Sequence, residues 1–150
     1  MPSRFDRDED YTLPALPMVS RPLRLVLAED DGDLRALLAA ELRRDGHDVI
    51  VLRDGPELAT YLARATCLTP ALAPADLVIS DLFMPGGGAC DLLSVLWSGS
   101  SAIPYVIITS FCDEETEAEA LSHGAHAVLS KPFDIDDLRA IIREVAVAYG

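Results

Sequence analysis

The sequence predicts an α/β fold in which a five-stranded parallel sheet is covered by helices on both faces. Short runs of β-branched and other apolar residues alternate along the chain with segments whose apolar residues recur at helical spacing. Strands that are apolar at nearly every position are typical of parallel sheets buried on both faces. Because connections between parallel strands are right-handed, this alternation indicates a doubly wound sheet.

The composition is that of a single globular domain. The 150 residues are half hydrophobic and a quarter charged, with a formal net charge of -13. This charge argues against nucleic acid or an anionic membrane as a direct partner. No apolar run approaches the roughly 20 residues that span a bilayer, and the first residues, MPSRFDRDEDY, lack a signal-peptide pattern. We therefore expect a cytoplasmic protein.

The folded part is predicted to begin at Leu23. Residues 1–22 carry mixed charges and then prolines, so we expect a flexible tail followed by one domain over 23–150. The run LRLVLA predicts the first strand over 23–28, and a helix over 33–45 ends at Gly46. The leucines on one face of that helix are Leu34, Leu37, Leu38 and Leu42.

The rest of the chain repeats the alternation. Short apolar runs bounded by turn formers predict further strands over 48–52, 76–80, 104–109 and 126–130. Helical spacing predicts further helices over about 56–66, 89–98, 113–122 and 134–148. Either Asp31 or Asp33 is expected to cap the first helix, and Asp134 to cap the last.

Five strands joined in this way favour the flavodoxin-like order 2-1-3-4-5. The carboxyl ends of the first, third, fourth and fifth strands then meet at one edge of the sheet, where ligands bind in open α/β folds. The residues brought to this edge are Glu29, Asp30, Asp81, Thr109, Ser110, Lys131 and Pro132.

This set of residues predicts phosphoryl transfer. Acids from two neighbouring strands repel each other unless a cation lies between them. Lys131, the only lysine in the chain, can be that cation. Oxygen ligands on an open edge also suit Mg²⁺. Asp81 is expected to be ionised at neutral pH and able to attack phosphorus. Lys131 and the metal would neutralise the phosphoryl oxygens, and Thr109 would donate a hydrogen bond.

Four motifs resemble, in order and spacing, the receiver domain of two-component response regulators. They are LAEDD (27–31), SDLFMP (80–85), IITS (107–110) and SKPF (130–133). The resemblance covers roughly residues 23–149.

The resemblance implies a role for each site residue. Asp81 would be the phosphoacceptor and would bind Mg²⁺ directly together with Asp30, while Glu29 would act mainly through water and the backbone carbonyl of Phe83 would complete the ligands. Lys131 would pair with the phosphoryl group and precede a cis bond to Pro132. Thr109 would move to the phosphoryl oxygen, and the small Ser110 would leave a way into the site.

The sequence departs from the family pattern in three places. Gly86, Gly87 and Gly88 replace the usual Asp-Gly after the phosphoacceptor, which predicts a loose loop. Where the family has an aromatic residue on the fifth strand that turns inward, this sequence has Val128, or His126 two residues earlier on the same face. We therefore expect the movement of Thr109 to be reported less clearly by the rotation of an aromatic side chain. Phe83 and Phe111 flank the phosphoryl position, and such large apolar side chains should exclude the hydrolytic water. We therefore expect a long-lived phosphorylated state.

The resemblance implies a histidine kinase or a histidine phosphotransfer protein as donor, and no turnover of small metabolites. Because the chain ends just after the fifth helix, we expect output through contact with a protein target. The expected face comprises the fourth helix, fifth strand and fifth helix, and a homodimer through it is a further expectation. One alternative is a pseudo-receiver that binds proteins without phosphorylation. A haloacid dehalogenase-like phosphohydrolase is disfavoured, because Phe83 stands where those enzymes need a second aspartate.

Overall fold

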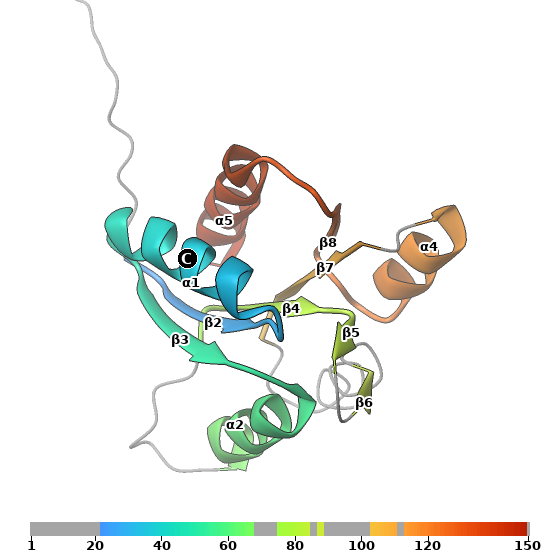
Figure 1. The fold of residues 1–150 in the computed structure, drawn as a ribbon, viewed down its shortest axis with the longest axis horizontal. Helices are drawn as coiled ribbons and strands as arrows, with labels where there is room; N and C mark the ends of the chain where they lie inside the picture. Colours follow the sequence, from blue (N-terminus) through green and yellow to red (C-terminus); the bar gives the residue numbers. More distant parts are fainter. Residues whose placement is uncertain (1–21, 68–74, 85–86, 89–102, 111–112, 150) are drawn as a thin grey trace, which may run out of the picture.

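A computed structural model describes residues 22–67, 75–84, 87–88, 103–110 and 113–149. Five parallel strands form its central sheet, in the order β3-β2-β4-β7-β8 (Figure 1). They are β2 (Arg24–Ala28), β3 (Asp48–Leu52), β4 (Leu77–Asp81), β7 (Tyr105–Thr109) and β8 (Ala127–Ser130). Taken in sequence order this is the arrangement 2-1-3-4-5, so the predicted flavodoxin-like fold is confirmed.

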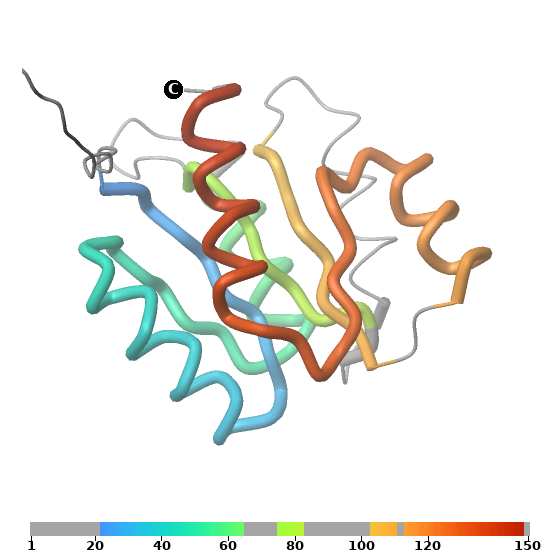
Figure 2. Tube along the Cα trace, turned by 90° about the horizontal axis from the view of Figure 1, so that it is seen from above, coloured from blue at the N-terminus to red at the C-terminus, as the bar shows by residue number. Residues whose placement is uncertain are grey.

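Helices cover both faces of the sheet. Helices α1 (Gly32–Arg44) and α5 (Ile135–Tyr149) bury leucine, isoleucine and valine side chains in one core layer. Helices α2 (Gly55–Cys67) and α4 (Glu114–Ser122) contribute to the layer on the opposite face. Figure 2 shows α1 and α5 side by side over the strands, with α4 beyond β8. No described helix is long and apolar enough to cross a membrane.

The strands alternate between the two core layers, as their pleat requires. Along β2, Leu25 and Leu27 enter the layer of α1 and α5, whereas Val26 and Ala28 enter the other. The central strands β4 and β7 are buried at every position, while the edge strand β8 is half-buried and ends in an exposed serine. Burial on both faces accounts for the apolar residues that open each central strand, LVI in β4 and YVII in β7.

The helix ends follow the predicted signals. Asp31, rather than Asp33, caps α1, because its side chain accepts hydrogen bonds from the N–H groups of Asp33 and Leu34. Asp134 Oδ1 accepts from the N–H of Asp136 at the start of α5. Gly46 follows α1 with a φ of 100°, a conformation that glycine adopts at low cost.

The glycine-rich segment after β4 differs from its sequence prediction. A short antiparallel pair, β5 (Phe83–Met84) with β6 (Gly87–Gly88), stands where only a loose glycine loop was expected. The helix predicted over about 89–98 and the tail before residue 22 lie outside the described residues.

Candidate functional site

The carboxyl ends of the strands bring the predicted polar residues together. Glu29 and Asp30 directly follow β2, Asp81 ends β4, Thr109 ends β7, and Lys131 directly follows β8. Glu29 and Thr109 are fully buried and Asp81 is 6% exposed, whereas Asp30 is exposed. The parallel register therefore places five polar side chains along one edge of an otherwise apolar sheet.

Three carboxylates and one ammonium form the centre of the site. Glu29, Asp30 and Asp81 each offer an oxygen, and these oxygens lie within 4.8 Å of one another. Lys131 Nζ donates a hydrogen bond to Asp81 Oδ2 at 2.8 Å and lies 2.9 Å from Glu29 Oε1. The peptide bond between Lys131 and Pro132 is cis, as the resemblance implied.

Glu29 is the most deeply buried acid of this group. Its Oε2 accepts the N–H of Asp31 at 3.0 Å, whereas Oε1 faces Lys131 without hydrogen-bond geometry and has no hydrogen-bond partner among the described residues. Burial raises the pKa of Glu29, more than the contacts with Lys131 and the Asp31 N–H lower it. Burial alone would lower the pKa of Lys131, but its contacts with Asp81 and Glu29 outweigh it and raise this pKa.

The donor set fits a hard divalent cation. All three acids offer oxygen, and the buried Oε1 of Glu29 has the Lys131 ammonium at 2.9 Å but no hydrogen bond of good geometry among the described residues. Mg²⁺ prefers carboxylates and water at an open edge of this kind. Phe83, whose carbonyl is the further predicted ligand, lies in β5 two residues after Asp81 and pairs with Gly88.

The predicted switch residues Thr109, Ser110 and Val128 lie on β7 and β8 or directly after β7. The N–H of Lys131 donates to the carbonyl of Thr109 at 2.7 Å, which fixes the end of β7 against the end of β8. Ser110 is exposed, and Val128 is half-buried against the core layer that contains Tyr105. Phe111 lies outside the described residues.

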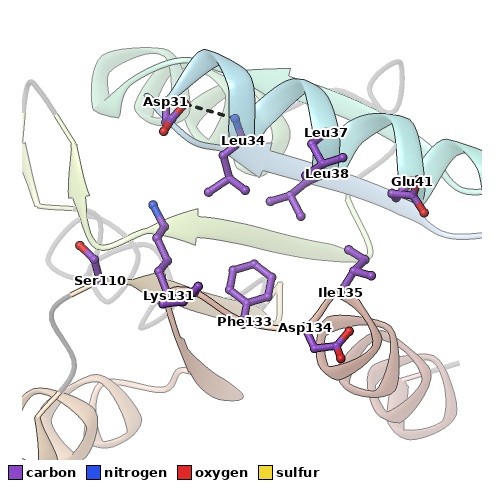
Figure 3. A pocket seen from close by; sticks show the side chains of 11 residues that line it. Asp31, Leu34, Leu37, Leu38, Glu41, Ser110, Lys131, Phe133, Asp134 and Ile135 are labelled. Atoms are coloured by element: carbon purple, nitrogen blue, oxygen red, sulfur yellow. Dashed lines mark hydrogen bonds between the residues drawn. The ribbon is translucent and has the colours of Figure 1, made fainter.

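A groove that sequence reasoning missed opens beside Lys131. Its volume is about 720 Å³, and it lies between α1 and the segment that leads into α5 (Figure 3). Leu34, Leu37 and Leu38 face Phe133 and Ile135 across it, with Lys131 at one end. Of the four leucines predicted on one face of this helix, Leu38 and Leu42 are buried in the core, whereas Leu37 is 58% exposed and lines the groove.

Comparison with known proteins gives a consistent result. The sequence profile of the family described as response regulator receiver domain matches residues 25–143. Two similar proteins come from Mycobacterium tuberculosis: the transcriptional regulatory protein PdtaR, 35% identical over 127 residues, and the DNA-binding response regulator MtrA, 32% identical over 120 residues. The matches cover 85% and 80% of this chain but 58% and 49% of theirs. The chain thus spans about half the length of these curated relatives.

Solved receiver domains share the fold. The receiver domain of the Francisella response regulator 1452 matches with a TM-score of 0.75 at 23% identity, over 85% of this chain and 99% of that one. The non-phosphorylated HemR receiver domain from Leptospira biflexa matches with a TM-score of 0.70 at 24% identity, over 84% of this chain and 94% of that one. At these identities the likeness concerns the fold alone.

Proposed function

The chain belongs to the response regulator receiver domain family, and on that premise we propose that it accepts a phosphoryl group from a phosphohistidine on Asp81. One observation carries most of the weight: Lys131 Nζ lies within 3 Å of both Asp81 and the buried Glu29, where three carboxylates converge. A structural role alone does not explain two acids held against Lys131 with a third carboxylate beside them. Residues 23–150 form the proposed receiver domain, and residues 1–22 precede it as a tail.

The reacting groups have distinct tasks in this proposal. The Asp81 carboxylate attacks phosphorus, so that an O–P bond forms as the P–N bond to the donor imidazole breaks and the imidazole keeps that electron pair. Lys131, already at 2.8 Å from Asp81, compensates the charge on a phosphoryl oxygen. Asp30, Asp81 and the Phe83 carbonyl would hold Mg²⁺, with Glu29 acting through water. When bound, the metal supplies positive charge to the phosphoryl oxygens.

The signal would leave the site through Thr109. Its hydroxyl is proposed to donate to the phosphoryl oxygen, which draws the end of β7 toward Asp81. Because Lys131 N–H is bonded to the Thr109 carbonyl, β8 follows that movement. Val128 on β8 cannot reproduce the inward rotation of an aromatic ring, so the change reaches the surface through the backbone of β8 and the neighbouring α4 and α5.

The donor is proposed to be a histidine kinase or a histidine phosphotransfer protein, and the output a protein contact at the face of α4, β8 and α5. The apolar groove between α1 and α5 ends at Lys131, so a protein docked there would have its reactive histidine close to Asp81. Homodimerisation through the α4, β8 and α5 face remains part of the proposal.

Intact-mass analysis after incubation with acetyl phosphate and Mg²⁺ tests the function. Wild type is expected to gain one phosphoryl group, while Asp81→Asn and an EDTA-treated sample gain none. If wild type gains none from acetyl phosphate or from a set of phosphohistidine donors, and titration shows no Mg²⁺ binding, the alternative of a pseudo-receiver replaces this proposal. The glycine loop and Val128 are the features that favour that alternative.

A long phosphoryl lifetime is the kinetic part of the proposal. Phe83 and Phe111 stand two residues after Asp81 and Thr109, where large apolar side chains would exclude the attacking water. Phe83→Asn and Phe111→Glu are therefore expected to shorten the half-life of the aspartyl phosphate by about tenfold each, which corresponds to about 1.4 kcal/mol of activation free energy. Decay is followed by intact mass after removal of the donor. Equal half-lives in wild type and both variants would contradict the proposal.

A further inference from the structure

Asp30 is the least restrained of the three acids at the site. Glu29 and Asp81 are buried, but Asp30 is exposed. Its position therefore depends on the peptide that joins it to Glu29. The N–H of Glu29 donates to the Leu52 carbonyl at 3.1 Å, and Oε2 of Glu29 accepts from Asp31. The other backbone polar atom of that residue is the Glu29 carbonyl oxygen, which belongs to the Glu29–Asp30 peptide.

Arg35 holds this carbonyl. Its Nη1 donates to the Glu29 oxygen at 2.7 Å, a short contact between a charged donor and a partly buried acceptor. The guanidinium lies over the start of α1, where a Cβ at Gly32 would be 3.5 Å from Nη2. The arginine thus reaches back over the first turn of its own helix to the strand end that precedes it.

The location of Arg35 is electrostatically unfavourable for the helix itself. Cations near a helix N-terminus oppose the helix dipole, whereas Arg43 and Arg44 stand in the last turn of α1, where the dipole favours them. A cation retained in the first turn needs a compensating contact, and the Glu29 carbonyl supplies one. That contact serves the end of β2, where the metal-binding acids stand.

We propose that Arg35 is a positioning residue for the metal site, fixing the Glu29–Asp30 peptide so that the Asp30 carboxylate points toward Asp81. The inference rests on the proposed function, because it assumes that Asp30 is a Mg²⁺ ligand. A ligand whose backbone is held in advance loses less freedom when the metal binds. Without Arg35 the peptide can rotate, and Asp30 would spend part of its time turned away from the site.

The positive charge of Arg35 has the opposite effect on Mg²⁺ binding to its positioning of the Glu29–Asp30 peptide. A guanidinium near the site repels a divalent cation, so its removal by itself favours Mg²⁺ binding. Salt separates the two effects, because the Debye length falls to about 4 Å in 0.5 M salt while a hydrogen bond persists. The positioning effect is therefore measured at high salt, and the difference between low and high salt reports the charge.

The chain offers a matched control on the same helix. Arg43 Nη2 donates to the Val49 carbonyl at 2.8 Å, and both arginines bond a carbonyl six residues away in sequence. Arg43→Ala removes an equivalent contact at the other end of α1, far from the acids. Arg35→Ala tests the proposal, and Arg35→Met keeps the alkyl stem in case the alanine variant folds poorly.

Mg²⁺ affinity is measured by titration calorimetry in 0.05 and 0.5 M KCl, and phosphorylation from acetyl phosphate by intact mass. At high salt both Arg35 variants are expected to raise the Mg²⁺ Kd about tenfold, as loss of an outer-shell partner does, and Arg43→Ala to leave it within twofold. Saturating Mg²⁺ should restore the phosphorylation rate of the Arg35 variants, because Arg35 acts through the metal ligand.

An unchanged Kd at high salt in either folded Arg35 variant would overturn the positioning role, as would an equal loss in Arg43→Ala. These outcomes differ from failure of the proposed function, in which wild type itself neither binds Mg²⁺ nor gains a phosphoryl group. In that case the role of Arg35 is overturned as well.

Discussion

Lys131 and Arg139 each join carboxylates from distant parts of the chain, but they do so in opposite environments. Lys131 meets Glu29 and Asp81, whose side chains are 0% and 9% exposed. Arg139 on α5 meets Asp45 and Glu41, whose side chains are 30% and 25% exposed. The acids that Lys131 meets are therefore buried, whereas water still reaches the acids that Arg139 meets; the two cations themselves are similarly exposed, at 18% and 24%.

The hydrogen bonding differs as much as the burial. Arg139 donates to both oxygens of Asp45, at 2.7 and 3.2 Å, to Glu41 at 2.9 Å and to Asp136 at 3.1 Å. Its hydrogen bonds, with Asp45 first, raise the pKa of the guanidinium. At the site, by contrast, Oε1 of Glu29 is buried and accepts no hydrogen bond among the described residues. The Arg139 contact between α5 and the end of α1 is fully hydrogen-bonded, whereas burial raises the pKa of Glu29 although Lys131 lies 2.9 Å from it.

The largest expected effect is that of Lys131→Met, which removes the cation and keeps a similar side-chain length. Two largely buried acids then lose their cationic partner, so the free energy of unfolding in metal-free buffer at pH 7 should fall by about 3 kcal/mol. Phosphorylation from acetyl phosphate should slow at least about a hundredfold, because a group that stabilises the transferred charge is lost. Urea unfolding and intact mass measure the two effects. A variant as stable as wild type would mean that the acids are already compensated by other groups.

Glu29→Gln is expected to act in the opposite direction on stability. The folded chain holds the Glu29 proton more tightly than the unfolded chain, since burial raises the pKa of Glu29. Wild type therefore loses stability as the pH rises from the unfolded pKa through the folded one. Glutamine mimics the protonated acid, so the variant should be more stable at pH 7, by an amount on the order of 1 kcal/mol.

This difference should shrink as the pH falls, because wild type then protonates Glu29 as well. Urea unfolding from pH 5 to 7.5, without Mg²⁺, follows it, and Arg139→Met at each pH provides a control that does not touch the site. A glutamine variant less stable than wild type across this range would show that the pair with Lys131 outweighs the cost of burying the charge.

The contrast between the two cations also explains what the sequence could predict. The proximity of Glu29, Asp81 and Lys131 could be predicted from the sequence, because each residue ends a strand or directly follows one. The strand order then determines which strand ends lie side by side. β4 and β7 each begin with an apolar run, LVI and YVII, that changes to polar residues at the carboxyl end, so their ends are sharply marked. The site was therefore predictable from local patterns combined with one topological rule.

The Arg139 cluster and the apolar groove had no such signal. Arg139 and Asp45 are 94 residues apart, and their contact depends on how closely α5 approaches the end of α1. The groove has the same origin, because Leu37 and Phe133 face each other only after both segments have docked on the sheet. A helical pattern assigns Leu37 to an apolar face, but it does not show whether that face meets the core or a groove. Such features depend on packing distances between elements.

Arg139→Met has the smallest expected effect and is the direct counterpart of Lys131→Met. Partly exposed ion pairs contribute little, so the free energy of unfolding should fall by about 1 kcal/mol at low salt and by less in 0.5 M KCl. The phosphorylation rate with acetyl phosphate should equal that of wild type, since none of the Arg139 contacts reaches Asp81 or Lys131. Urea unfolding at the two salt concentrations and intact mass provide the measurements. A changed phosphorylation rate in a stably folded variant would mean that the α1–α5 contact affects the site. The distinction between Arg139 as a purely structural residue and Lys131 as a residue of the reaction would then be wrong.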